Sequence, residues 1–119
     1  MDEREPPRNP VLEIGALQIN ASTFEVRLDG HLITLSAQDF KVLLHLARQA
    51  GEVVSKEELW RSVWGQADNT GFDDAIRSSI KRLRQTLEYD LEHPAYILTV
   101  HGVGYVMPKA PLLRKDSSS

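Results

Sequence analysis

The chain has 119 residues, of which 41% are hydrophobic and 26% are charged. A chain of this length forms one domain with its own core, and this composition excludes a disordered, collagen-like or coiled-coil protein as a whole. It contains no cysteine, which excludes disulfides, thiol catalysis and cysteine-based metal sites and fits a reducing compartment. No apolar run approaches the roughly 20 residues that span a bilayer, and the first residues do not form a signal peptide. We therefore expect a cytoplasmic protein that does not enter a membrane.

Positive charge is concentrated in one short segment. The net charge is -3, from 14 Lys and Arg against 17 Asp and Glu, which argues at first against a nucleic-acid partner. Between Arg77 and Arg84, however, there are four basic residues and no acidic one, so the other 111 residues carry 10 basic and 17 acidic groups. A run of charged residues can simply be a helix face exposed to solvent. The predicted elements around this segment are therefore needed to distinguish such a face from a binding surface.

Both ends of the chain are predicted to be tails or linkers. Residues 1–10 hold three prolines and five charges without periodicity, and residues 108–119 end in three serines. The folded domain is therefore expected to span residues 11–107. The charged, proline-rich leader suggests a piece cut from a longer chain whose other domain lies upstream.

The first part of the predicted domain, from Val11 to Leu35, alternates apolar and polar residues with a period of two. The alternation breaks at Gly15-Ala16, at Asn20-Ala21-Ser22 and at Asp29-Gly30. The last break is a strong signal for a two-residue hairpin turn of type I′. This pattern predicts a four-stranded antiparallel sheet.

Two helices are predicted after this sheet. Ser36 is an N-cap with an acidic residue three positions later, and apolar residues then recur at helical spacing for about 14 residues until Gly51. Val53-Val54 is a short extended link. Ser55-Lys56-Glu57-Glu58 is a capping box that opens a second helix of roughly three turns, which ends before Gly65.

A third helix and a hairpin complete the predicted domain. The helix starts near Asp73 and runs past Leu87, and its apolar residues fall within a narrow arc that packs on the core. After Pro94, two runs, Tyr96 to Val100 and Tyr105 to Met107, bracket His101-Gly102-Val103-Gly104, which predicts a terminal β-hairpin. The arc on the third helix consists of Ile76, Ile80, Leu83 and Leu87.

Four strands, three helices and a hairpin, with the basic helix directly before the hairpin, form a winged helix-turn-helix of the α+β class. A rigid helix about 10–12 Å wide fits the major groove of duplex DNA, where base edges are distinguishable. Flanking cations and the hairpin can contact phosphates. The order of elements therefore favours duplex DNA as the partner.

Several linked motifs also resemble a known family, the OmpR/PhoB-type DNA-binding domains, which form the effector half of many two-component response regulators. The resemblance covers residues 12–107 and implies sequence-specific DNA binding that regulates transcription, without a cofactor. The motifs are Asp29-Gly30 with Leu35 and Phe40, the run from Gly51 to Leu59, Val63-Trp64-Gly65, the run from Ile80 to Arg84, and the run from Thr99 to Tyr105.

The resemblance implies DNA contacts on the third helix. Arg82 falls on the position that usually reaches bases, and Ser78 falls on another base-facing position. Lys81 and Arg84 fall on positions that face the backbone. With the wing included, the expected DNA-binding residues are Arg77, Ser78, Lys81, Arg82, Arg84, Gln85, Thr99, His101 and Gly102.

The wing and one loop complete the contacts that the resemblance implies. Thr99 falls on a phosphate-contacting position, and His101 falls where the family commonly has a minor-groove arginine. A further loop resembles the one that touches RNA polymerase in activators of this type. It consists of Gly65, Gln66, Ala67, Asp68, Asn69, Thr70, Gly71 and Phe72. The resemblance also implies a monomer that pairs head-to-tail on DNA, and a receiver or other sensor domain upstream.

The sequence departs from the family pattern at four places. Asp74 stands where a basic residue is common, Arg77 where an acid is common, and Thr86 where lysine is common. His101 replaces the wing arginine, and a neutral histidine gives little attraction to the minor groove at pH 7. Each departure weakens or moves a phosphate contact.

The same residues leave one alternative open, a winged helix that binds another protein without significant DNA contact. The negative net charge, Asp74 and the missing wing arginine favour it. An enzyme is not expected, because no nucleophile, base and orienting residue form a set. The four histidines show no short-spaced pairing and no clustered carboxylate, so no metal site is expected either.

Overall fold

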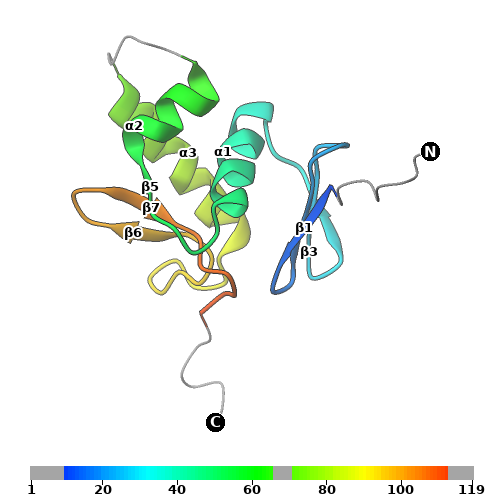
Figure 1. Cartoon of the computed structure of the whole chain (residues 1–119). Coiled ribbons are helices and arrows are strands. Elements are labelled where there is room, and N and C mark those ends of the chain that lie inside the picture. Colours follow the sequence, from blue (N-terminus) through cyan, green and yellow to red (C-terminus); the bar gives the residue numbers. More distant parts are fainter. Residues whose placement is uncertain (1–9, 66–70, 113–119) are drawn as a thin grey trace.

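The computed structural model describes residues 10–65 and 71–112, so most of each predicted tail (residues 1–9 and 113–119) and residues 66–70 of the loop after Gly65 lie outside the described residues. The chain forms a four-stranded sheet, then a set of helices, then a three-stranded sheet (Figure 1). The helices stand between the N-terminal sheet and the second sheet, whose hairpin extends beside the third helix. This is the predicted α+β layout.

The N-terminal sheet is an antiparallel meander, as predicted, with its strands in the order β1-β2-β3-β4. Between β3 and β4, Asp29 and Gly30 have φ values of 57° and 83°, and a type I′ turn requires positive φ at both positions. The apolar residues of the period-two pattern, such as Leu17 and Ile19, are buried against the helices. The strands are β1 (Val11–Ile14), β2 (Leu17–Asn20), β3 (Glu25–Leu28) and β4 (His31–Ile33).

The first helix, α1 (Ala37–Arg48), has 12 residues and is slightly shorter than predicted. The side chain of Ser36 accepts a hydrogen bond from the backbone N–H of Asp39 and caps the helix. The helix ends early because Gln49 leaves the helical conformation, with φ −105° and ψ 25°. Phe40 is buried and stacks on Phe24, with ring centroids 4.4 Å apart.

The second helix differs from the prediction in its later part. The predicted cap is present, because the Ser55 side chain accepts a hydrogen bond from Glu58 N. The helix then consists of α2 (Lys56–Leu59), which continues as a π-helical turn, η1 (Trp60–Trp64). The indole rings of Trp60 and Trp64 stack with centroids 5.2 Å apart.

The third helix, α3 (Phe72–Leu87), has 16 residues and carries the basic segment. Its predicted arc of Ile76, Ile80, Leu83 and Leu87 is buried. The prediction that it runs past Leu87 is wrong, because Glu88 has an extended conformation, with φ −88° and ψ 133°.

The second sheet has three strands, whereas the sequence predicted only a hairpin. The order is β5 (Val54–Ser55), β7 (Gly104–Val106) and β6 (Leu98–Val100), all antiparallel. The predicted link at Val53-Val54 therefore contributes a strand. Gly104 is required in β7, because a Cβ there would collide with the backbone of Val54.

Strand β6 also begins later than predicted, at Leu98 rather than at Tyr96. The backbone N–H groups of Tyr96 and Ile97 donate to the carboxylate of Glu88 at 2.9 Å each, so this segment is held by a side chain instead of a neighbouring strand.

Contacts between distant parts of the chain join the N-terminal sheet to the rest. Ala16 N donates to the Tyr96 hydroxyl at 3.3 Å, and Leu112 N donates to Ala95 O at 3.1 Å. The segment after Met107 therefore packs back on the domain. None of the described helices combines the length and the apolar character that a bilayer-spanning helix needs.

Candidate nucleic-acid interface

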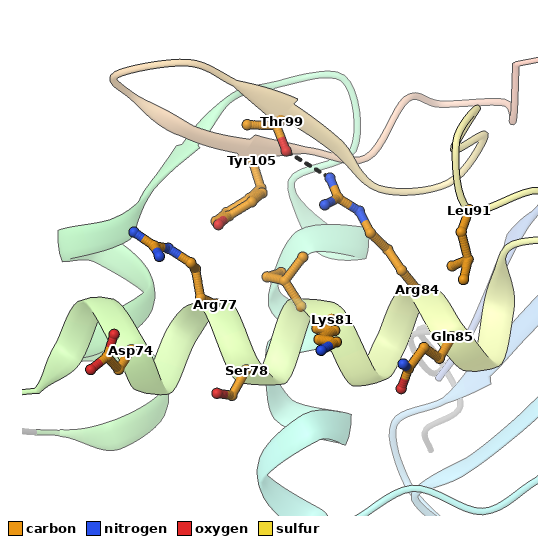
Figure 2. A pocket seen from close by; sticks show the side chains of 10 residues that line it. Asp74, Arg77, Ser78, Lys81, Arg84, Gln85, Leu91, Thr99 and Tyr105 are labelled. Atoms are coloured by element: carbon orange, nitrogen blue, oxygen red, sulfur yellow. Dashed lines mark hydrogen bonds between the residues drawn. The ribbon is translucent and has the colours of Figure 1, made fainter.

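An open groove lies between α3 and the hairpin β6–β7, which we call the wing (Figure 2). It gathers most of the predicted contact residues of α3 together with Thr99 of the wing, and it leaves out Arg82, His101 and Gly102. The groove is lined by Asp74, Arg77, Ser78, Ile80, Lys81, Arg84, Gln85, Leu91, Thr99 and Tyr105.

Arg84 holds α3 and the wing together. Its Nη2 donates to the Thr99 hydroxyl at 2.7 Å and to Ile97 O at 3.0 Å, and its Nε also donates to Ile97 O. The guanidinium lies 5.9 Å from the centre of the Tyr105 ring. Figure 2 shows Arg77 and Arg84 rising from α3 toward the wing on either side of Tyr105. Arg84 thus fixes the width of the groove at this end.

Arg77 belongs to an exposed ionic cluster at the start of α3. Its Nη2 lies 3.0 Å from Asp73 Oδ2, and Lys56 Nζ of α2 lies 2.8 Å from Asp73 Oδ1. The hydrogen bond from Lys56 lowers the pKa of Asp73, and the same contact raises the pKa of Lys56. Asp73 therefore shares its charge between two cations, of which Arg77 lines the groove.

Arg82, the predicted base-contacting residue, lies outside the groove and points toward α1. Its Nε donates to Asp39 Oδ2 at 2.8 Å, and its Nη2 donates to Asp39 Oδ1 at 3.0 Å. Ser79 Oγ donates to the same Oδ1 at 2.6 Å. Burial alone would raise the pKa of Asp39, but the hydrogen bonds from Arg82 and Ser79 outweigh it and hold the pKa below its usual value.

Four polar side chains of α3 are exposed and make no hydrogen bond or ion pair within residues 10–65 and 71–112: Asp74, Ser78, Lys81 and Gln85. Lys81 is therefore the one cation of the basic segment that has no internal partner among the described residues, since Arg77, Arg82 and Arg84 each donate to another side chain. Gln85 also lines a second hollow on the α1 side, together with Asp39 and Arg82.

The tip of the wing is exposed at both predicted contact residues. His101 lies in the turn between β6 and β7, and Gly102 has a φ of 79°, which favours glycine at this position. The hydrogen bond from Val103 N to Val100 O closes the turn. The wing thus presents the imidazole of His101 at its tip.

Sequence reasoning missed three residues that shape this surface. Asp39 was expected only as part of a helix start, and Ser79 was not singled out, yet together they hold Arg82. Glu88 accepts hydrogen bonds from Ala95 N at 2.7 Å and from the next two residues, and so sets where the wing begins. No local sequence pattern indicates these roles. Asp39 is far from Ser79 and Arg82 in the sequence, and Glu88 binds a segment that has no regular secondary structure.

Two histidines have carboxylate partners that the sequence did not indicate. His45 Nε2 lies 2.8 Å from Glu58 Oε2, which joins α1 to α2, and His93 Nδ1 lies 3.0 Å from Asp90 Oδ2. In the described parts of the chain, no three His, Cys, Asp or Glu side chains gather as metal ligands would.

Of the loop predicted to contact RNA polymerase, residues 66–70 lie outside the described residues. Gly65 ends η1 in the left-handed conformation, with φ 68°, and Gly71 precedes α3 with φ 74°. Phe72 begins α3 and packs against Trp60, with ring centroids 5.8 Å apart.

An exposed polar helix beside a β-hairpin wing, supported by two further helices, defines a winged helix-turn-helix domain. The family model described as "Transcriptional regulatory protein, C terminal" matches residues 30–107. The chain belongs to this family, which consists of OmpR/PhoB-type DNA-binding regulators and not of enzymes.

Curated relatives agree with this assignment. The chain is 36% identical over 95 residues to the sensory transduction protein RegX3 of Mycobacterium leprae, covering 80% of this chain and 48% of the relative. It is 33% identical over 106 residues to the regulatory protein VanR of Enterococcus faecium, covering 89% of this chain and 46% of the relative. The chain thus spans about half the length of the curated relatives it matches.

Solved structures give the same fold. The response regulator DrrB of Thermotoga maritima, an OmpR/PhoB homologue, is 37% identical with a TM-score of 0.75, covering 89% of this chain and 46% of that one. The DNA-binding domain of RstA from Klebsiella pneumoniae, solved in complex with the RstA box, is 30% identical with a TM-score of 0.76. That match covers 83% of this chain and 97% of the RstA domain.

Proposed function

We propose that this domain binds duplex DNA in a sequence-specific way and acts as the effector of a transcriptional regulator of the two-component type. The observation that carries the proposal is the polar face of α3, on which Ser78, Lys81 and Gln85 are exposed beside the wing. An α-helix fits the major groove, and a hairpin next to it reaches the adjacent backbone. The RstA domain, which shares this fold, is solved on its DNA box.

The contact residues of the proposal are those that the sequence indicated. Ser78, Gln85 and Arg82 face base edges. Lys81, Arg84, Arg77 and Thr99 face phosphates, and His101 with Gly102 lies at the minor groove. Arg77 and Arg84 keep spare N–H groups beyond their internal partners, so each can add a phosphate contact without leaving its place.

The wider setting of the domain is also a proposal. A receiver domain upstream would account for the half of the relatives that this chain does not cover, and the expected location is then the cytoplasm. The domain is expected to be a monomer that pairs head-to-tail on half-sites about one helical turn apart. The loop at residues 65–72 is the expected contact with RNA polymerase.

Salt dependence tests the function directly. If the domain neutralises about four phosphates, the logarithm of its affinity for duplex DNA should fall with the logarithm of salt concentration with a slope of about -3 to -4. Fluorescence anisotropy on a labelled duplex between low and physiological salt measures this slope. A flat response would overturn the proposal and favour a module that binds another protein.

A further inference from the structure

The contact between α1 and α3 at Arg82 is asymmetric. The side chain of Asp39 is 5% exposed, whereas that of Arg82 is 55% exposed. Both carboxylate oxygens of Asp39 accept hydrogen bonds from Arg82, and Ser79 supplies a third. The carboxylate is therefore anchored inside the protein, and the guanidinium extends from it to the surface of α3.

The guanidinium of Arg82 keeps one edge free. A guanidinium has five N–H groups, and Asp39 takes one on Nε and one on Nη2. Both N–H groups of Nη1 and the second of Nη2 remain, and no other acceptor within residues 10–65 and 71–112 takes them. The Nη1–Nη2 edge is the fork that can bind O6 and N7 of guanine together.

We propose that Asp39, supported by Ser79, is a positioning residue that fixes the direction of this fork, so that discrimination between base sequences depends on a carboxylate of α1. The inference rests on the proposed DNA-binding function. An unrestrained arginine side chain loses conformational entropy when it binds a base. The hydrogen bonds from Arg82 to Asp39 restrict the side chain before DNA binds, so less entropy is lost on binding. Because the carboxylate also offsets the charge of Arg82, the gain lies in direction and not in general attraction to DNA.

Two simpler roles for Asp39 make different predictions. If Asp39 acted only through its charge, Asp39→Asn would strengthen binding to every duplex, because a negative charge near the phosphates is removed. If Asp39 acted only on stability, the folded variant would keep the wild-type ratio of affinities for two duplexes. A positioning role predicts a loss on the preferred duplex alone.

The test uses the whole 119-residue chain. The wild type first selects a preferred duplex from a random pool, and a shuffled duplex of the same composition is the reference. The affinities of wild type, Asp39→Asn and Asp73→Asn are then measured on both. Asp73→Asn is the matched control, because it removes the same charge from the exposed cluster.

Asp39→Asn should lower the ratio of preferred to shuffled affinity by about two- to tenfold, the effect of freeing one ordered side chain. Asp73→Asn should strengthen binding to both duplexes alike. If the wild type selects no duplex, the proposed function fails and this inference fails with it. If the wild type discriminates and Asp39→Asn keeps the ratio, the positioning role alone is overturned.

A double-mutant cycle keeps the test decisive. Arg82→Lys retains the charge and lacks the fork, so Asp39→Asn should change the ratio no further in that background. Independent losses from the two substitutions would overturn the inference. Thermal melting verifies that each variant is folded. If Asp39→Asn does not fold, Ser79→Ala, which keeps both charges, takes its place in the cycle with a smaller expected loss.

Discussion

Two carboxylates pair with cations of α3 in different surroundings. Asp73 is 43% exposed and shares its charge between Lys56 and Arg77, whereas Asp39 is 5% exposed and holds Arg82 with the help of Ser79. Exposed ion pairs contribute little to stability, because water screens the attraction between the two charges. The cation of such a pair can therefore exchange its carboxylate partner for a phosphate at little cost. A buried carboxylate cannot lose its donors without a large cost. We therefore expect the exposed cluster to supply charge to a partner and the buried one to supply geometry.

The largest expected difference between the two clusters is in stability. Asp39→Ala should lower the free energy of unfolding by about 2–3 kcal/mol, because it leaves Ser79 and Arg82 without their shared acceptor. Asp73→Ala should have a much smaller effect, because its partners are exposed to water. Urea denaturation of the two variants measures both values. Equal losses would show that burial does not separate the clusters.

The effect of an alanine substitution on DNA binding should differ between Arg82 and its neighbour Lys81. Arg82→Ala is expected to cost about 1–3 kcal/mol on the preferred duplex and much less on random sequence, because it removes a contact to a base edge. Lys81→Ala should weaken binding to both duplexes similarly, because a phosphate contact is present in any sequence. Titration of both variants on both duplexes decides this, and the same pattern for the two would contradict the assignment.

Stability should also fall in acid. The pKa of Asp39 in the folded protein is below its value in the unfolded chain, so the stability that this carboxylate contributes is complete above about pH 4 and is lost as pH falls through the folded value. Denaturation at several pH values between 6 and 2.5 should show a flatter acid limb for Asp39→Asn than for wild type. The same dependence of stability on pH in both proteins would show that Asp39 does not contribute to the loss of stability in acid.

The smallest expected effect is at the tip of the wing, where His101 is exposed. His101→Arg should strengthen binding to DNA by about two- to threefold, because it places a permanent cation at the tip. His101→Ala, which carries no charge, is the reference variant, and fluorescence anisotropy on a labelled duplex measures all three affinities. Identical affinities for wild type and both variants would place the wing away from DNA.

The elements that sequence analysis predicted correctly have local causes. The turn at Asp29-Gly30 and the caps at Ser36 and Ser55 depend on residues within one or a few positions, and the buried arc of α3 depends on spacing alone. The strand at Val54–Ser55 was missed because two residues become a strand only through pairing with β7, about 50 residues later.

The same distinction applies to the candidate site. The basic segment was visible in the sequence because its residues are neighbours, and the structure brings most of them to one groove. The restraint on Arg82 was not visible, because its partner lies 43 residues earlier on another helix. Local patterns thus predicted which residues of α3 are candidates for contact with a partner. The orientation of Arg82 depends on the packing of α1 against α3, which no local pattern shows.

The carboxylate of Glu88 has a consequence for the order of folding. It joins the end of α3 to the start of the wing through partners only seven to nine residues away, so these contacts close a short loop. The bond between Ala16 N and the Tyr96 hydroxyl spans 80 residues and closes a long one. Because short loops close at a smaller entropic cost, we expect α3 and the wing to assemble early in folding, with the N-terminal sheet docking onto a recognition surface that is already formed.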